Sequence, residues 1–169
     1  MLVKENPEVT VTLPSAKEIR FTCLFRRPRQ ALFDAWTRPE HIRHWWGCEG
    51  SSIPVCEVDL RVGGLWKVIM RMSDGSAQPF HGVYREIVRG ERLVYTECYD
   101  APQFGSPEWL ATVTFEEIDG ATRLTHTIRH RSRKVRDGHL KAGMETGAIQ
   151  SLNHLDEQAA RMLKGNVED

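Results

Sequence analysis

Three titratable side chains fall on segments that otherwise alternate apolar and polar residues. We expect His81, Glu97 and His126 each to lie on the apolar face of a β-strand. A carboxyl group and two imidazoles in such a setting can act as general acid and base, or can anchor a ligand by hydrogen bonds. The alternative is a structural role, in which each group is satisfied within the core. Because a buried carboxylate is costly unless it is paired, Glu97 is expected to meet Arg85 or one of the histidines.

The sequence contains no motif that is diagnostic of another kind of site. The two histidines and the glutamate come from separate strands without metal-ligand spacing, so we predict no metal and no cofactor. The four cysteines form no C-x-x-C pair, which favours reduced thiols. There is no G-x-S-x-G elbow, and Gly63-Gly64 lies within a hairpin and not between a strand and a helix.

Length and charge limit the class of protein. A chain of 169 residues fits a single domain, 1–169, in which residues 1–15 are expected to form a loosely ordered arm with a short edge strand near Val9–Leu13. The formal net charge is zero, which argues against nucleic acid and anionic membranes as partners. No apolar run is long enough to span a bilayer and the N-terminus is unlike a signal peptide, so we expect a cytoplasmic monomer or homodimer.

A hairpin at the centre of the chain organises the expected fold. From Pro54 to Met72, two alternating runs flank Gly63-Gly64, whose glycines are suited to the positive φ angles of a tight turn. Trp66 and Met70 share one face of the second run, which leaves a large apolar surface that needs a cover. The other expected strands are 18–25, 80–88, 92–99, 109–118 and 122–130, and short helices after Pro28 and Pro39 follow the first of them.

The C-terminal segment is expected to form one long helix that covers the sheet. Ser132 can cap it, and apolar residues from Leu140 to Met162 recur every three or four positions. Gly138, Gly143 and Gly147 interrupt the pattern, which indicates a break near Gly138 or a helix face that is free of side chains. The space between sheet and helix therefore need not be filled.

Strand phase selects the residues that would line such a space. We place His81, Val83 and Ile87 inward on the fourth strand because Ile87 needs burial, although Tyr84 and Val88 fit the opposite phase. The alternative to a cavity is an ordinary filled core. The candidate ligand-binding residues are Trp46, Trp66, Val68, Met70, His81, Tyr95, Glu97, Trp109, Val113, His126, Ile128, Met144, Ala148 and Ser151.

Several segments are similar to one known family. They are 26–37 (RRPRQALFDAWT), Trp45-Trp46-Gly47, 58–64 (VDLRVGG), 82–87 (GVYREI), 91–97 (ERLVYTE) and Gly143-Met144-Glu145. These motifs resemble the START-like (SRPBCC) superfamily, in the branch named for homology to the activator of the heat-shock-protein ATPase. The resemblance implies an α+β, helix-grip fold, in which a curved antiparallel sheet of six to seven strands surrounds a long C-terminal helix with a cavity between them.

The resemblance also draws attention to Ala148. Relatives often carry methionine or tryptophan immediately after the glycine that corresponds to Gly147, so alanine here leaves space beside Met144. We expect a binding protein for a small hydrophobic or aromatic molecule. One alternative is a cyclase- or hydrolase-type enzyme that uses His81, Glu97 or His126 in the same cavity. Another is a co-chaperone that stimulates a heat-shock ATPase.

Overall fold

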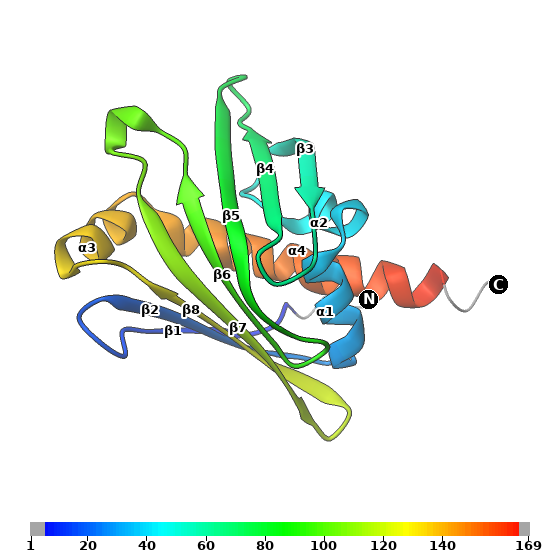
Figure 1. Ribbon diagram of the computed structural model, residues 1–169. Coiled ribbons are helices and arrows are strands. Elements are labelled where there is room, and N and C mark those ends of the chain that lie inside the picture. Colours follow the sequence, from blue (N-terminus) through cyan, green and yellow to red (C-terminus); the bar gives the residue numbers. More distant parts are fainter. Residues whose placement is uncertain (1–5, 166–169) are drawn as a thin grey trace.

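The computed structural model describes residues 6–165 as a single antiparallel sheet with helices on its concave side (Figure 1). No helix in that range is long and apolar enough to cross a membrane. In chain order the elements are β1 (Val9–Thr12), β2 (Glu18–Phe25), α1 (Arg29–Thr37), α2 (Pro39–Trp45), β3 (Ser52–Val58), β4 (Leu65–Arg71), β5 (Ala77–Val88), β6 (Arg92–Tyr99), a 3₁₀ turn (Pro102–Phe104), β7 (Glu108–Ile118), β8 (Ala121–Arg129), α3 (Arg133–Lys141) and α4 (Met144–Gly165).

The sheet order is β1-β2-β8-β7-β6-β5-β4-β3, with every neighbouring pair antiparallel. The two hairpin strands and the four strands expected after them therefore form one antiparallel meander, β3 to β8. The expected total of six to seven strands was too low, because the sheet has eight. The eighth strand is β1, the short edge strand expected near Val9–Leu13, in which Val9 lies opposite Cys23 of β2.

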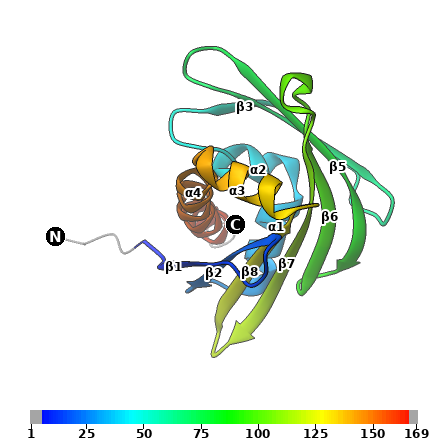
Figure 2. The same cartoon turned by 90° about the vertical axis from the view of Figure 1, so that its left-hand side faces the viewer.

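The sheet curves around α4, which Figure 2 shows nearly end-on. α1 and α2 pack against α4, while α1 also contacts β7 and α2 contacts β3. The two short helices therefore close one side of the space between the sheet and α4. This is the helix-grip arrangement, in an α+β fold, as predicted.

Alternation along β2 buries the face that the sequence predicts. Ile19, Phe21, Cys23 and Phe25 are at most 1% exposed, and the residues between them are half-buried or exposed. Leu155 of α4 is fully buried and belongs to the same apolar cluster. The helix is therefore held against this half of the sheet by a filled core.

The C-terminal helix is broken at a different glycine from the one expected. The Ser132 side chain accepts a hydrogen bond from the Val135 amide at 3.2 Å, so the predicted cap is present. α3 continues through Gly138 and ends at Lys141, and Gly143 has a φ of +86°. Glycine adopts this left-handed conformation without strain, and the positive φ turns the chain before α4 begins at Met144.

The two hairpin glycines serve different purposes. Gly63 has the positive φ, +84°, that the sequence predicts. Gly64 is not left-handed, but a Cβ atom there would lie 2.0 Å from the Asp59 carbonyl oxygen. It is required because the backbone of the β3–β4 connection passes so close.

The phase predicted for β5 was wrong in its first half. His81 is exposed, whereas Tyr84 is only 5% exposed and faces inward. The pairing of β5 with β6 shifts register between Tyr84 and Glu86. Such a bulge inserts one residue and reverses the alternation, so Ile87 can be half-buried while His81 points outward. His81 is thus excluded as a cavity residue.

Candidate ligand-binding cavity

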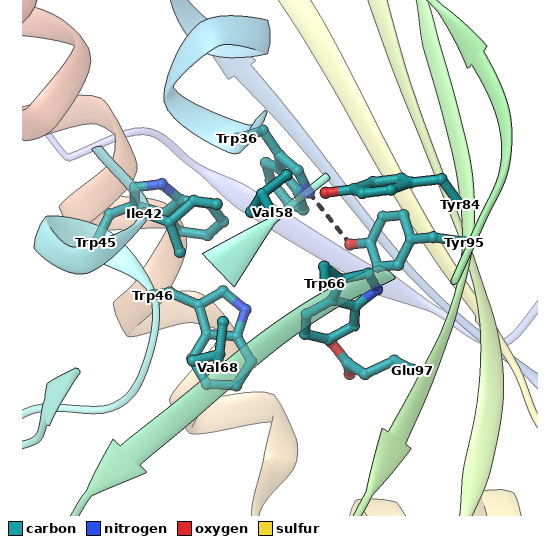
Figure 3. A pocket seen from close by; sticks show the side chains of 10 residues that line it. All are labelled: Trp36, Ile42, Trp45, Trp46, Val58, Trp66, Val68, Tyr84, Tyr95 and Glu97. Atoms are coloured by element: carbon teal, nitrogen blue, oxygen red, sulfur yellow. Dashed lines mark hydrogen bonds between the residues drawn. The ribbon is translucent and has the colours of Figure 1, made fainter. Parts of the chain in front are cut away.

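A cavity of about 220 Å³ lies between α4 and the sheet. We call it the main cavity. A smaller space of about 30 Å³, the aromatic end, shares five lining residues with it (Figure 3). The main cavity is lined by Trp36, Trp45, Trp46, Gly47, Cys48, Met70, Phe80, Tyr95, Glu97, Trp109, His126, Ile128, His139, Met144, Gly147, Ala148, Ser151 and Leu152. The aromatic end is lined by Trp36, Ile42, Trp45, Trp46, Val58, Trp66, Val68, Tyr84, Tyr95 and Glu97.

The structure brings most of the candidate residues to this space. Those that line the main cavity or the aromatic end are Trp46, Trp66, Val68, Met70, Tyr95, Glu97, Trp109, His126, Ile128, Met144, Ala148 and Ser151. His81 lies outside this space, because it is exposed on the outer face of β5. Val113 has the predicted inward direction on β7 but is fully buried in the core. α1 covers β7 near this point, where Phe33 packs edge-on against Phe115 with ring centroids 5.5 Å apart.

Sequence reasoning missed four prominent lining residues. Trp36 and Trp45 recur at helical spacing with other apolar residues, which predicts burial but not access to a cavity. Phe80 was missed because of the phase error on β5. His139 lies on α3, whose position over the cavity depends on the break at Gly143. For His139, no local sequence pattern could have given this placement.

The aromatic end is built from rings that fix each other's orientation. Trp66 and Tyr95 meet edge-to-face with centroids 5.8 Å apart, and Tyr84 meets Tyr95 at 6.0 Å. Trp36 lies 4.7 Å from Trp45. Three indole N–H groups are used within the protein. Trp36 donates to the Tyr95 hydroxyl at 3.1 Å, Trp45 to the Ala35 carbonyl at 2.8 Å, and Trp66 to the Thr96 carbonyl at 3.1 Å. These side chains therefore offer the cavity their ring surfaces.

Ser151 fixes the loop after α2 to α4. Its hydroxyl donates to the Gly47 carbonyl at 2.7 Å and accepts from the Gly47 amide at 3.1 Å. Gly47 has a φ of +108°, and a Cβ atom there would lie 2.7 Å from the Ser51 hydroxyl oxygen and 3.0 Å from the Met70 sulfur. The Ser151 hydroxyl is thus engaged by the backbone, and its role is to hold the cavity wall.

Glu97 is the carboxylate of the cavity. It extends from β6 opposite Trp109 of β7. Glu97 is half-buried, and desolvation of its carboxyl group raises the pKa from the ordinary 4.5 to about 7, while the nearby Trp109 indole N–H opposes this rise by favouring the carboxylate. The Trp109 Nε1 atom is buried without a well-formed hydrogen bond to any described residue. The expected pairing with Arg85 or a histidine is absent among the described residues, and Arg85 is exposed.

The histidines around the cavity are held neutral. Burial lowers the pKa of His126 to about 4, and its ring packs edge-on against Trp36 at 5.3 Å. His139 of α3 and His130, which follows β8, lie with Nδ1 and Nε2 2.9 Å apart, and burial lowers the pKa of each to about 4. At pH 7 the cavity therefore has imidazoles but no imidazolium. No group of three metal-ligating side chains is found within residues 6–165.

Comparison with known proteins agrees with this architecture. Solved structures similar to this chain include a Nitrosomonas europaea protein (22% identity, TM-score 0.81, 90% of this chain and 99% of that one) and a Rhodobacter sphaeroides protein (23%, 0.82, 91% and 99%). An AHSA1 protein of Silicibacter pomeroyi is 22% identical with a TM-score of 0.69, covering 86% of this chain and 99% of that one. No curated protein matches the chain. The family model described as Activator of Hsp90 ATPase homolog 1-like protein matches residues 26–160, and the chain belongs to that family.

Proposed function

We propose that this protein binds a small apolar or aromatic molecule in the main cavity. The observation that carries the proposal is a volume of about 220 Å³ walled mainly by aromatic rings, Met70, Met144 and Ile128. An apolar cavity of about 150 Å³ is large enough to bind benzene. All five tryptophans of the chain line the main cavity or the aromatic end, so intrinsic fluorescence reports on occupancy.

Filling the cavity at Ala148 tests the proposal. Ala148→Met should leave the free energy of unfolding within about 1 kcal/mol of wild type, or raise it, because the new side chain enters empty space. Its affinity for tert-butylbenzene should fall, because the methionine occupies the ligand's position. Thermal melts and fluorescence titrations measure the two quantities.

Ala159 provides the matched control on the same helix. It is fully buried in the core and lines neither space. Ala159→Met should therefore cost about 1–3 kcal/mol, as overpacking does. Equal destabilisation by the two substitutions would show that the Ala148 site is already filled, and the proposed function would lose its support.

Glu97 supports a second candidate, an enzyme of cyclase or hydrolase type in the same cavity. A carboxyl group whose pKa is about 7 is suited to proton transfer at neutral pH. His126, neutral at pH 7, lines the main cavity with it. Native mass spectrometry separates the candidates, because a ligand that is released unchanged favours binding and a product favours catalysis. The family description gives a third candidate, stimulation of a heat-shock ATPase, which an ATPase assay with the purified chaperone tests.

A further inference from the structure

The carboxyl group of Glu97 lies in the cavity without a positive charge to balance it. Neither the main cavity nor the aromatic end is lined by any arginine or lysine within residues 6–165. The two lining histidines, His126 and His139, are neutral at pH 7. A carboxylate that is desolvated in this way without a cationic partner costs folding free energy. The presence of Glu97 is better explained if the ligand carries the positive charge that balances it.

The surroundings of Glu97 favour the same kind of partner. Trp36, Trp45, Trp46, Trp66, Tyr84 and Tyr95 line the aromatic end together with it, and Figure 3 shows these rings with the Glu97 carboxyl group below them. The negative ring faces of tryptophan and tyrosine attract organic cations. Because Trp36, Trp45 and Trp66 already donate their N–H groups to protein acceptors, their remaining surface is the ring itself.

The other charge types fit less well. An anionic ligand would meet Glu97 and no lysine or arginine among the described lining residues. A neutral ligand would displace water from the site and leave the Glu97 carboxylate without a balancing charge. An ammonium group on an apolar body satisfies both the carboxylate and the aromatic rings, and leaves the rest of the main cavity to the apolar part.

We propose that the ligand of this protein is an organic cation whose ammonium group lies in the main cavity beside Glu97, against the rings that the main cavity shares with the aromatic end. The inference rests on the proposed function and names the chemical class of the ligand. The titratable groups that face the same space are Tyr84 of β5, Tyr95 of β6, His126 of β8, His139 of α3 and Cys48. Tyr84 and Tyr95 remain neutral, because burial raises the pKa of each.

Two probes of the same shape test the charge requirement. Phenyltrimethylammonium has a positively charged nitrogen where tert-butylbenzene has its quaternary carbon atom, and the two molecules are otherwise the same. At pH 8 the cation should bind at least about tenfold more tightly than the hydrocarbon, measured by tryptophan fluorescence and calorimetry. Equal or weaker binding of the cation would overturn the inference and leave the proposed function standing. Failure of both probes to bind would overturn both.

Glu97→Gln keeps the size of the side chain and removes its charge. In this variant the preference for the cation should be lost, while tert-butylbenzene binds at least as well as it does to wild type. Glu57→Gln is the matched control, because Glu57 is exposed on β3 and lines neither space. A preference that survives in Glu97→Gln would contradict the assignment of Glu97.

The pH dependence of the wild-type protein gives an independent check that needs no variant. Phenyltrimethylammonium does not titrate, so its affinity follows the ionised fraction of Glu97. From pH 6 to pH 8 the affinity should rise about tenfold, as a carboxyl group with a pKa near 7 loses its proton. A flat profile for the cation, with tert-butylbenzene also flat, would contradict the inference.

Discussion

The substitution Glu97→Gln should raise the free energy of unfolding of the ligand-free protein more at pH 8 than at pH 5, by about 2–3 kcal/mol. The folded-state pKa of Glu97, about 7, lies above the ordinary value of 4.5. The folded protein therefore binds more protons than the unfolded chain between these values. The stability that this group contributes is present below pH 4.5 and is lost as the pH rises through 7.

Denaturant unfolding of wild type and variant at both pH values measures this effect. At pH 5 the protonated carboxyl group resembles the amide, so the two proteins should differ little. His126, His130 and His139 have the opposite sign, because their lowered pKa values remove stability as the pH falls from 6.5 through 4. They are present in both proteins, so their contributions cancel in the difference. If the difference in free energy of unfolding between the two proteins does not depend on pH, the pKa of Glu97 is not raised in the folded protein.

Gly82→Ala should lower the free energy of unfolding by at least about 3 kcal/mol, the upper range for overpacking. A Cβ atom at Gly82 would lie 1.7 Å from the Thr96 carbonyl oxygen and 2.5 Å from Trp66 Nε1. Trp66 crosses Gly82 to donate to that carbonyl at 3.1 Å, and the Val83 amide donates to the Thr96 hydroxyl at 3.0 Å. The substitution would therefore separate β5 from β6 and displace a wall of the aromatic end.

Gly138→Ala is the control for this prediction. Gly138 lies within α3, and no atom lies within 4 Å of a Cβ built there, so alanine should stabilise the helix by about 1 kcal/mol. Thermal and urea denaturation of the two variants should thus shift in opposite directions. A Gly82→Ala protein that unfolds like wild type would show that β5 and β6 are not in close contact there.

The need to bury Leu93 was enough to predict the inner face of β6. Leu93, Tyr95 and Glu97 occur at every second position, and the strand pairs with β7 in one register throughout. The same reasoning failed on the first half of β5, because a bulge after Tyr84 inserts one residue and so brings Tyr84 and Ile87 to the same face. A single extra residue was enough to turn His81 outward.

The sequence could not decide between a cavity and a filled core. Sequence pattern identifies inward positions such as Val113 and Ile128 but not what covers them. In the structure α1 lies over β7 near Val113, whereas Ile128 faces the main cavity. That difference depends on how far the helices lie from the sheet, which is set by contacts distant in sequence, such as the pair of hydrogen bonds between Ser151 and Gly47.

A crystal structure with bromobenzene would show directly whether the main cavity binds an apolar molecule, because bromine can be located by its anomalous scattering. We expect a bromine peak in the main cavity of the wild-type protein, among Trp46, Trp109 and Ala148, and its loss in Ala148→Met crystals prepared in the same way. A wild-type structure with no bromine in the cavity, in which side chains fill the space between α4 and the sheet, would contradict the claim that this space binds an apolar molecule.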